Sequence, residues 1–218
     1  MTDETVEAVF DAVASIAPEI RTTLVEQPEF ESEHNPSGDE QIAADVYADR
    51  LLEEDILSLD GVGQYASEER DDVHADGEGY AVAVDPVDGS SNIETNNAAG
   101  TIVGVYDGDL PTTGEHLVGA TYVLYGPRTT MVTATEGAVT EYLVDSGERE
   151  VVREEIAVPD DASETGVYGF GGRVPDWPAD LQSFVHEVED ELKLRYSGSM
   201  IADVNQVLTY GGTFADPA

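Results

Sequence analysis

The feature that most constrains this chain is a strand pattern that ends in two carboxylates and a glycine. Residues 80–84 alternate as a β-strand does, so Asp85 should lie at the carboxyl end of that strand, where Pro86 should stop ladder pairing. Asp88 follows, and Gly89 lets the backbone approach an anion closely. The segment therefore predicts either a metal and phosphate site or, because Asp, Pro and Gly are ordinary turn residues, a plain acidic turn.

A second acidic pair lies upstream of this segment. Residues 62–66 form another short strand pattern, and Glu68 and Glu69 follow Ser67 directly after it. If the two strand ends meet, the clustered carboxylates would repel one another and raise one another's pKa unless a cation neutralised them. Hard oxygen ligands in a chain without Cys favour Mg²⁺ or Mn²⁺. Taken alone, Glu68 and Glu69 would be a solvated acidic pair, so the metal prediction depends on the combination.

The composition indicates the solvent in which the chain works. It has 47 Asp and Glu against 9 Lys and Arg, a formal net charge of −38, yet 40% of its residues are apolar, which argues for a packed core. Salt at about 1 M shortens the Debye length to ~3 Å and screens this charge, so the composition is typical of a salt-accumulating halophile. Nucleic acid and membrane are excluded as partners by repulsion. Without a membrane-span pattern or an evident secretory signal, a cytoplasmic location is predicted.

Hydrophobic periodicity predicts the order of helices and strands. A first helix is expected over residues 6–17 after a Thr2–Asp3 cap, and a second from Asp39 to about residue 59, with a polar loop over 28–38 between them. Residues 80–152 read as strands divided by Gly-containing turns, which indicates a mostly antiparallel sheet. The elements expected after a change of character near residue 158 are a helix over 180–192, a strand over 194–196 and a helix over 200–208.

Four blocks of the sequence together resemble a known family. They are Ser37-Gly38-Asp39 with Asp45, Ser67-Glu68-Glu69, residues 85–92, and residues 195–203 with Tyr210-Gly211-Gly212. In this order and combination the chain resembles class I fructose-1,6-bisphosphatase, within the magnesium-dependent, lithium-sensitive sugar phosphatases. The match runs from near residue 37 to the last residue.

The resemblance implies a role for each matching residue. The implied ligands of two or more Mg²⁺ or Mn²⁺ ions are Glu68, Asp85, Asp88 and the Val87 carbonyl. The implied catalytic acids, which help to activate the attacking water, are Asp39, Asp45 and Glu69. The implied substrate-binding groups are Asp88, Gly89, Ser90 and Ser91 at the reacting phosphate, with Arg195 and Tyr196 at the other phosphate. The Arg would come from a neighbouring subunit, so a homo-oligomer, either a dimer or a tetramer, is also implied.

The implied fold is the layered α/β (α+β) sugar-phosphatase fold. N-terminal helices on a mostly antiparallel sheet would occupy residues 1–157, and a second α/β domain would occupy residues 158–218. We expect this second domain to be truncated, because the family's C-terminal metal-binding Glu and substrate-binding Lys have no counterpart here. The implied activity is metal-dependent hydrolysis of the 1-phosphate of fructose 1,6-bisphosphate, a step of gluconeogenesis. The alternatives are a sedoheptulose bisphosphatase or broader sugar phosphatase, and a non-catalytic relative that binds metal or sugar phosphate.

Overall fold

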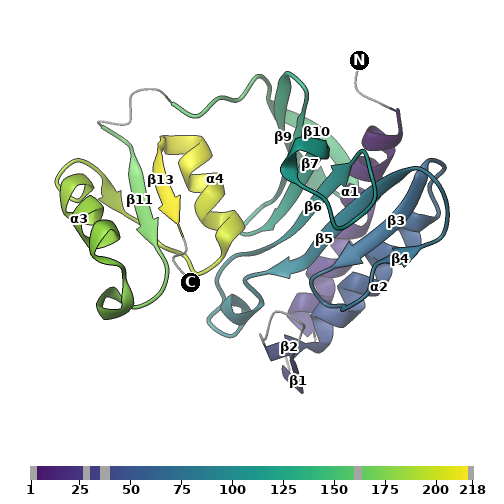
Figure 1. Cartoon of the computed structure of the whole chain (residues 1–218), viewed down its shortest axis with the longest axis horizontal. Coiled ribbons are helices and arrows are strands. Elements are labelled where there is room, and N and C mark those ends of the chain that lie inside the picture. Colours follow the sequence, from purple (N-terminus) through teal and green to yellow (C-terminus); the bar gives the residue numbers. More distant parts are fainter. Residues whose placement is uncertain (1–3, 27–29, 35–39, 160–163, 216–218) are drawn as a thin grey trace.

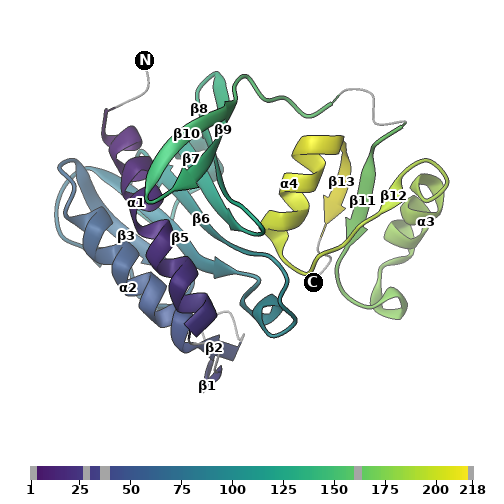
Figure 2. The ribbon, with the colours of Figure 1, turned by 180° about the vertical axis from the view of Figure 1, so that it is seen from behind.

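The protein is built from alternating layers of helix and sheet. The computed structural model describes residues 4–26, 30–34, 40–159 and 164–215 of the chain. Helices α1 (Glu4–Glu26) and α2 (Ala43–Leu57) cover one face of a large sheet, and α4 (Met200–Tyr210) lies on the other face (Figure 1). A small sheet follows α4, with α3 (Ala179–Val188) beyond it, as the reverse view also shows (Figure 2). The predicted layered α/β fold is confirmed.

The large sheet has eight strands in the order β10-β9-β8-β7-β6-β5-β3-β4. Their bounds are β3 Val62–Ser67, β4 His74–Ala75, β5 Tyr80–Asp88, β6 Ala99–Tyr106, β7 Leu117–Tyr125, β8 Thr129–Thr135, β9 Ala138–Asp145 and β10 Glu148–Arg153. Every neighbouring pair is antiparallel except β3 and β5, which run parallel with Ser67 opposite Val84. These two strands therefore end at the same edge of the sheet.

Helices α1 and α2 form the cover of the large sheet because each has a continuous buried stripe. The apolar stripe predicted for the first helix is buried throughout, at Val6, Val9, Phe10, Val13, Ile16 and Ala17. Burying each large aliphatic or aromatic side chain contributes roughly 1.5–3 kcal/mol. The buried stripe of α2 differs because it includes two aspartates, Asp45 and Asp49, between its apolar positions. Buried carboxylates need partners, and those of Asp49 lie at the edge where β3 ends.

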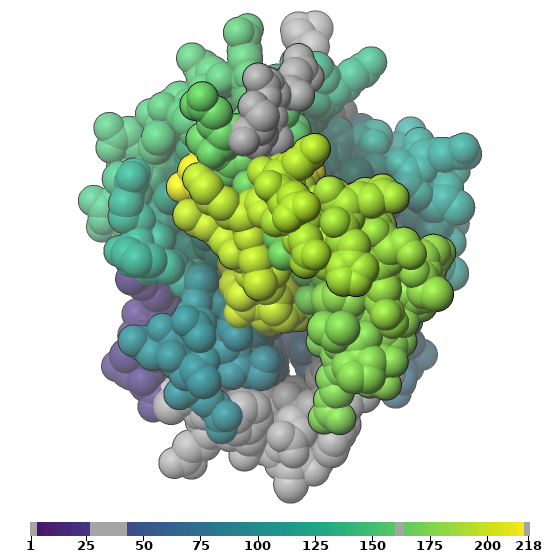
Figure 3. Space-filling model, turned by 90° about the vertical axis from the view of Figure 1, so that its left-hand side faces the viewer, coloured from purple at the N-terminus to yellow at the C-terminus, as the bar shows by residue number. Residues whose placement is uncertain are grey.

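The C-terminal part is a three-stranded sheet with a helix on each face. Its central strand β11 (Val167–Phe170) is parallel to both β12 (Lys193–Leu194) and β13 (Gly212–Ala215). Phe170 packs edge-on against Phe184 of α3, with ring centroids 6.1 Å apart. On the other side, Ile201 of α4 joins Tyr122 and Val132 in a core cluster with the large sheet. Figure 3 views the molecule from this end, with the yellow-green C-terminal residues in front of the teal strands.

The remaining short elements lie in the connections between these layers. Three 3₁₀ turns occur at η1 (Ser90–Ile93), η2 (Gly114–His116) and η3 (Val174–Asp176). Two short strands, β1 (Phe30–His34) and β2 (Glu40–Ile42), pair antiparallel before α2. Of these, η1 directly follows the acidic end of β5, so it belongs to the candidate site.

Some local predictions were wrong, and others fall outside the described residues. The loop predicted over 28–38 contains β1. Because β1 pairs with β2, the second helix begins at Ala43 and not at Asp39 as predicted. Asp39 and the Thr2–Asp3 cap lie outside the described residues. Pro86 does not end β5, because Asp85 lies opposite Ile102 and the ladder resumes with Asp88 opposite Gly100. The extra residue on β5 forms a bulge, which is a position where a strand tolerates proline.

Candidate active site

The acidic ends of β3 and β5 lie side by side. Parallel pairing sets Ser67 opposite Val84, and the backbone N–H of Glu68 donates to the Val84 carbonyl at 3.0 Å. Glu68 therefore follows β3 at the level where Asp85 continues β5, and the negative charge of Glu68 acts on the Asp85 carboxyl group. The sequence predicted that these strand ends could meet, and the structure brings Glu68 and Asp85 together.

The carboxyl group of Asp85 is held in an environment that disfavours its charge. Burial raises its pKa, and the negative charges of Glu68, Asp88 and Glu69, with the hydrogen bond to Glu68, raise it further, to about 8. An aspartic acid ordinarily has a pKa of about 4, so both burial and the neighbouring negative charges disfavour the ionised form of Asp85. A bound cation is the usual means of offsetting such repulsion.

The donor set fits a divalent metal in its chemistry, although the ligands have not converged. Carboxylate oxygens are the ligands that Mg²⁺ and Mn²⁺ prefer, and the chain has no Cys to offer instead. Across residues 4–26, 30–34, 40–159 and 164–215, however, no three acidic or histidine side chains stand together as a formed metal site. The charges of Glu68, Asp85 and Asp88 are nevertheless close enough to act on one another.

The orientation of Asp88 explains why the acids do not converge. Its Oδ2 accepts hydrogen bonds from Ser199 Oγ at 2.5 Å and from the backbone N–H of Ile201 at 2.9 Å. Its Oδ1 accepts from the backbone N–H of Met200 at 3.2 Å. These donors form the amino terminus of α4, where unpaired N–H groups attract a carboxylate. Asp88 thus links the large sheet to the C-terminal part.

Gly89 is required where β5 turns into η1. Its φ of +73° is left-handed, a conformation that side chains rarely adopt. A Cβ added there would lie 2.6 Å from Ser199 Cβ, so glycine also lets the first residues of α4 approach the turn. Ser90 is half-buried and Ser91 is exposed within η1, at the position predicted to hold a phosphate. The turn therefore has two constraints, its own backbone and the neighbouring helix.

The bulge between the two aspartates of β5 is fixed from behind. Thr101, which is fully buried on β6, donates from Oγ1 to the Pro86 carbonyl at 2.7 Å. The same hydroxyl lies 2.9 Å from the Tyr125 hydroxyl. Val87, whose carbonyl is a predicted metal ligand, buries its side chain in the core. Hydrogen bonding and packing thus hold the segment that carries the candidate ligands.

The predicted catalytic acids have different positions. Asp45 is buried in the first turn of α2, and Asp39 lies outside the described residues. Glu69 follows Glu68, and its backbone N–H donates to Ser67 Oγ at 3.2 Å. The negative charge of Glu69 is among those that raise the pKa of Asp85. The structure therefore brings Glu69 to the acidic cluster, whereas the catalytic role of all three acids stays a prediction.

Arg195 and Tyr196 lie on the C-terminal part, and both are exposed. The Arg195 backbone N–H donates to the Tyr168 carbonyl at 2.9 Å, which extends the pairing of β12 with β11. Its guanidinium lies 5.0 Å from the centre of the Tyr210 ring and donates to Gln206 Oε1 at 3.3 Å. These contacts hold the Arg195 side chain against α4.

Three residues that had no predicted role complete the site. Ser199 binds Asp88, and Asn92 donates from Nδ2 to the carbonyls of Ala98 at 2.9 Å and Ser197 at 3.0 Å. Asp203 accepts the Ser197 backbone N–H on both carboxylate oxygens at 3.0 Å. All three belong to the blocks that carried the family resemblance, so the signal was present in the sequence but the partners were not.

Solved structures with this arrangement define the class of protein. The holo form of Leishmania major fructose-1,6-bisphosphatase superposes with a TM-score of 0.86 and 25% identity over 95% of this chain and 72% of that one. The structure of a candidate sedoheptulose-1,7-bisphosphatase from Toxoplasma gondii superposes with a TM-score of 0.84 and 25% identity. The match covers 100% of this chain and 75% of that one. The layered fold with acidic strand ends is therefore that of the sugar bisphosphatases.

Sequence comparison identifies the family within this class. The fructose-1-6-bisphosphatase N-terminal domain matches residues 4–154, and the C-terminal domain matches residues 162–218. "Fructose-1,6-bisphosphatase class 1" proteins of Natronomonas pharaonis and Halobacterium salinarum are each 52% identical over 98% of this chain, and the match covers 76% and 75% of their lengths. The chain belongs to the fructose-1,6-bisphosphatase family.

One general property agrees with these relatives. The strongly acidic composition is that expected for a halophile, and these relatives come from halophilic archaea. Among the helices that the structure describes, none combines the length and apolar character that crossing a membrane requires.

Proposed function

We propose that this chain hydrolyses the 1-phosphate of fructose 1,6-bisphosphate, giving fructose 6-phosphate and inorganic phosphate in gluconeogenesis in the cytoplasm. The observation that carries the proposal is the meeting of Glu68 and Asp85 at one sheet edge, directly before the Gly89 turn. Acidic metal ligands next to a backbone anion site are what phosphate-ester hydrolysis requires. Membership of a family named for this reaction supports the same substrate.

Members of this family use divalent metal ions, and we propose Mg²⁺ or Mn²⁺, two or more per site, for this chain. Glu68, Asp85, Asp88 and the Val87 carbonyl would hold them. When bound, such ions offset the charge of the phosphate and lower the pKa of an attacking water. What supports this assignment is the position of Asp85, whose pKa is raised first by burial and then by the negative charges of Glu68, Asp88 and Glu69 around it. Asp88 would have to exchange contacts with α4 for contacts with metal.

The chain's own groups would divide the remaining work. Gly89, Ser90 and Ser91 would hold the reacting phosphate through backbone and hydroxyl donors, with Asp88 beside them. Asp39, Asp45 and Glu69 would accept the proton that water loses as its oxygen bonds to phosphorus. The bond from phosphorus to the C1 oxygen then breaks, and that oxygen takes up a proton from solvent water to become the sugar hydroxyl. Ser90 and Ser91 are proposed as binders because no His or Lys adjoins them in sequence to act as a base.

Recognition of the second phosphate would involve Arg195 and Tyr196. Because Arg195 lies against α4 on the exposed C-terminal part, its contribution to a neighbouring subunit's site is compatible with its contacts. We therefore propose a homo-oligomer, a dimer or tetramer, in which this arginine completes the neighbouring site. A folded monomer with full activity would contradict that proposal.

The test is phosphate release from fructose 1,6-bisphosphate at molar KCl with Mg²⁺. Asp85→Asn should lower the rate by at least about a hundredfold, the usual scale for a group that acts on transition-state charge, because it removes charge from a proposed metal ligand. The variant should still fold. A chelator should abolish the wild-type rate, and restored Mg²⁺ should return it. Metal binding without phosphate release from any sugar bisphosphate would instead favour the non-catalytic alternative.

Sedoheptulose 1,7-bisphosphate is a second candidate substrate. The observation that favours it is the TM-score of 0.84 to the Toxoplasma gondii structure, close to the 0.86 for the Leishmania major enzyme. The ratio of kcat/KM for the two bisphosphates discriminates the candidates, and inositol monophosphate serves as a third substrate. A preference for inositol monophosphate would contradict both bisphosphatase assignments.

A further inference from the structure

An arginine directly follows the two glutamates of the candidate site. Arg70 comes immediately after Glu68 and Glu69, in a chain with only 9 Lys and Arg in total. A guanidinium binds carboxylates tightly and in a fixed geometry. Paired with Glu68 or Glu69, it would occupy oxygens that a metal needs and would add positive charge beside the metal. The Arg70 guanidinium therefore has to lie away from Glu68 and Glu69 if these acids are to bind metal.

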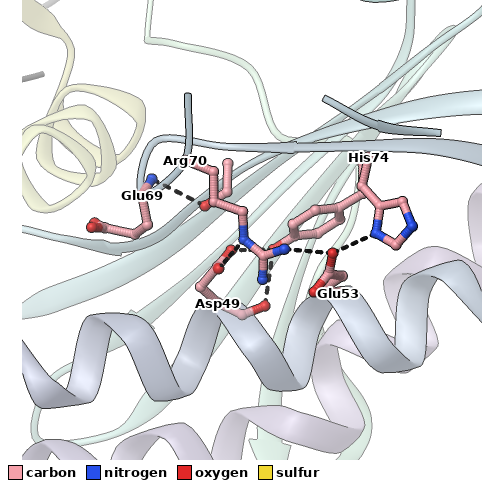
Figure 4. A network of polar contacts seen from close by, with 7 residues as sticks. Asp49, Glu53, Glu69, Arg70 and His74 are labelled. Carbon is pink, nitrogen blue, oxygen red and sulfur yellow. Dashed lines mark hydrogen bonds and ion pairs between the residues drawn. The ribbon is translucent and has the colours of Figure 1, made fainter. Parts of the chain in front are cut away.

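The structure places the Arg70 guanidinium on α2. Its Nε lies 2.5 Å from Asp49 Oδ2, and its Nη1 donates to Glu53 Oε1. The side chain turns from the end of β3 toward the helix, whereas the Glu69 carboxylate points to the other side (Figure 4). The turn itself is closed by the Arg70 backbone N–H, which donates to the Ser67 carbonyl at 3.2 Å. Arg70 and Glu69 thus leave the same turn in different directions.

Asp49 and Glu53 on α2 together form the binding site for the Arg70 guanidinium. Asp49 and Glu53 are four residues apart, so they lie on the same side of the helix. The Asp49 side chain is 5% exposed, and its Oδ1 accepts the Tyr65 hydroxyl at 3.0 Å while Oδ2 binds Arg70. Glu53 is bound a second time by His74 Nδ1 at 2.7 Å. Each acid therefore has a second partner besides Arg70, Tyr65 for Asp49 and His74 for Glu53, which helps to fix its side chain.

The energetics agree with a firmly held guanidinium. Burial opposes the Arg70 charge, but hydrogen bonds and charge interactions with Glu53 and Asp49 outweigh it and raise its pKa. Removing Arg70 would leave Asp49 almost fully buried and without its counter-ion, which is a costly state for a carboxylate. The arrangement is therefore held from both sides, by an arginine that stabilises α2 and by acids that fix the arginine.

We infer that Asp49 and Glu53 are positioning residues for the metal site. They hold the positive charge of Arg70 on α2, away from the glutamates of the preceding turn, which the proposed function places at a divalent-cation site. The inference rests on the proposed function in one respect, because it takes these glutamates to be part of a metal site. Asp49 also lies one helical turn after Asp45, so the same ion pair ties the face of α2 that carries a candidate catalytic acid to the end of β3.

The test first neutralises Asp49 and Glu53 and then removes the positive charge of Arg70. Asp49→Asn with Glu53→Gln keeps both side-chain shapes but frees Arg70 to pair with the turn's glutamates. We expect Mn²⁺ affinity to fall about tenfold in this double variant, since a nearby cation opposes metal binding. Adding Arg70→Gln should restore the affinity to within about twofold of wild type, because the competing charge is gone. A purely structural ion pair predicts the opposite, a triple variant no better than the double.

Mn²⁺ binding is followed by electron paramagnetic resonance at molar KCl, without substrate. The binding counted is the part that Asp85→Asn abolishes, which removes loose association with the acidic surface. Glu141→Gln is the matched control, because it breaks a comparable pair, Arg153 Nε to Glu141 Oε2 at 2.6 Å, on β9 and β10. Its affinity should equal that of wild type. A loss in Glu141→Gln as large as in the double variant would overturn the inference.

Glu53→Gln alone provides the test if the double variant does not fold. Its side chain is more exposed than that of Asp49, at 17% against 5%, so the fold should tolerate the change. We expect an affinity loss of about threefold that Arg70→Gln, made together with Asp49→Asn so that no buried carboxylate loses its counter-ion, reverses; no reversal would overturn the inference. Because the readout needs no substrate, it is separable from the proposed function. Phosphate release with an unaltered Mn²⁺ affinity in every variant would sink the inference and leave the function intact.

Discussion

Asp88, the last residue of β5, accepts a hydrogen bond from Ser199, the N-cap of α4, with 2.5 Å between Ser199 Oγ and Asp88 Oδ2. The two residues are 111 positions apart and belong to the large sheet and the C-terminal part respectively. Ser199 Oγ also accepts the Ala202 backbone N–H at 3.3 Å, so one hydroxyl both caps the helix and binds the aspartate. This contact joins the candidate metal ligand to the part of the chain that would hold the substrate's second phosphate.

Ser199→Ala should weaken the fold by about 1–2 kcal/mol, because it removes an N-cap and a hydrogen bond to a carboxylate together. Asp88 would retain its backbone donors on Met200 and Ile201, so the protein should still fold. Urea unfolding at molar KCl measures the change. Ser183→Ala is the control, since that hydroxyl only donates to the Ala179 carbonyl within exposed α3 and should cost less than about 0.5 kcal/mol. Equal losses in the two variants would contradict the role given to Ser199.

Gly89→Ala should cost more stability than a left-handed glycine normally does. The new Cβ would meet Ser199 Cβ at 2.6 Å in addition to the strain of a φ of +73°. Gly137→Ala is the matched control, because Gly137 has a φ of +86° but no heavy atom within 4 Å of its would-be Cβ. We expect roughly 1 kcal/mol for Gly137→Ala and at least about twice that for Gly89→Ala. A similar cost at both positions, measured by thermal unfolding, would show that the approach of α4 adds nothing.

Thr101→Val tests the support behind the bulge of β5. The substitution keeps the shape but leaves the buried Pro86 carbonyl without its donor, at a cost of about 1–3 kcal/mol. Thr121→Val makes the same change on β7, where Oγ1 donates to the Val132 carbonyl at 2.9 Å. Thr101→Val should lose more stability than Thr121→Val, because the buried Tyr125 hydroxyl also loses this partner, and only Thr101→Val should raise the Mg²⁺ concentration needed for half-maximal phosphate release. The idea fails if Thr121→Val raises that requirement as much.

Glu53→Gln should lower stability in a pH-dependent way. The hydrogen bond from Arg70 lowers the pKa of Glu53, burial opposes the shift, and the contact with His74 lowers it further. A lowered carboxyl pKa stabilises the fold at pH values above the ordinary one, about 4.3, and this contribution is lost as the pH falls through the folded value. The variant should therefore be less stable than wild type at pH 7 by up to about 1 kcal/mol, since the side chain is partly exposed. The difference should shrink as the pH falls below the ordinary carboxyl value and should vanish once Glu53 is protonated in the folded protein, as unfolding curves at a series of pH values would record.

Glu54→Gln supplies the comparison for this pH dependence. Glu54 adjoins Glu53 on α2 but is exposed, so its neutralisation should leave the unfolding free energy within about 0.5 kcal/mol at every pH. A pH profile of Glu53→Gln that runs parallel to wild type would mean that the ion pair with Arg70 does not contribute to stability.

Local patterns were sufficient for much of the fold. The apolar stripe of α1 was predicted residue by residue because a 3.6-residue period specifies a buried face without reference to any partner. The strands from β5 to β10 were predicted for the same reason, since alternating hydropathy and glycine turns are local signals. Strands β1 and β2 were missed because their pairing, and not their composition, makes them strands.

Arg70 illustrates what a local reading of the site cannot give. By sequence it adjoins Glu68 and Glu69, and an adjacent cation suggests a partner for them. The structure directs it instead to Asp49 and Glu53, which lie 21 and 17 positions away on α2. Side-chain direction at a turn depends on what packs against that turn, so adjacency in sequence was no guide to the contact.

The sequence alone determined which groups the site contains: the carboxylates at two strand ends, the glycine that turns the backbone and the acidic composition that requires salt. Only the tertiary structure decided how those groups meet. Parallel pairing of β3 with β5 set Glu68 beside Asp85, and the packing of α4 on the large sheet gave Asp88 its partner in Ser199. The physical reason is that strand pairing and layer packing join residues far apart in the chain, where the free energy comes from burial and hydrogen bonding that no local pattern encodes.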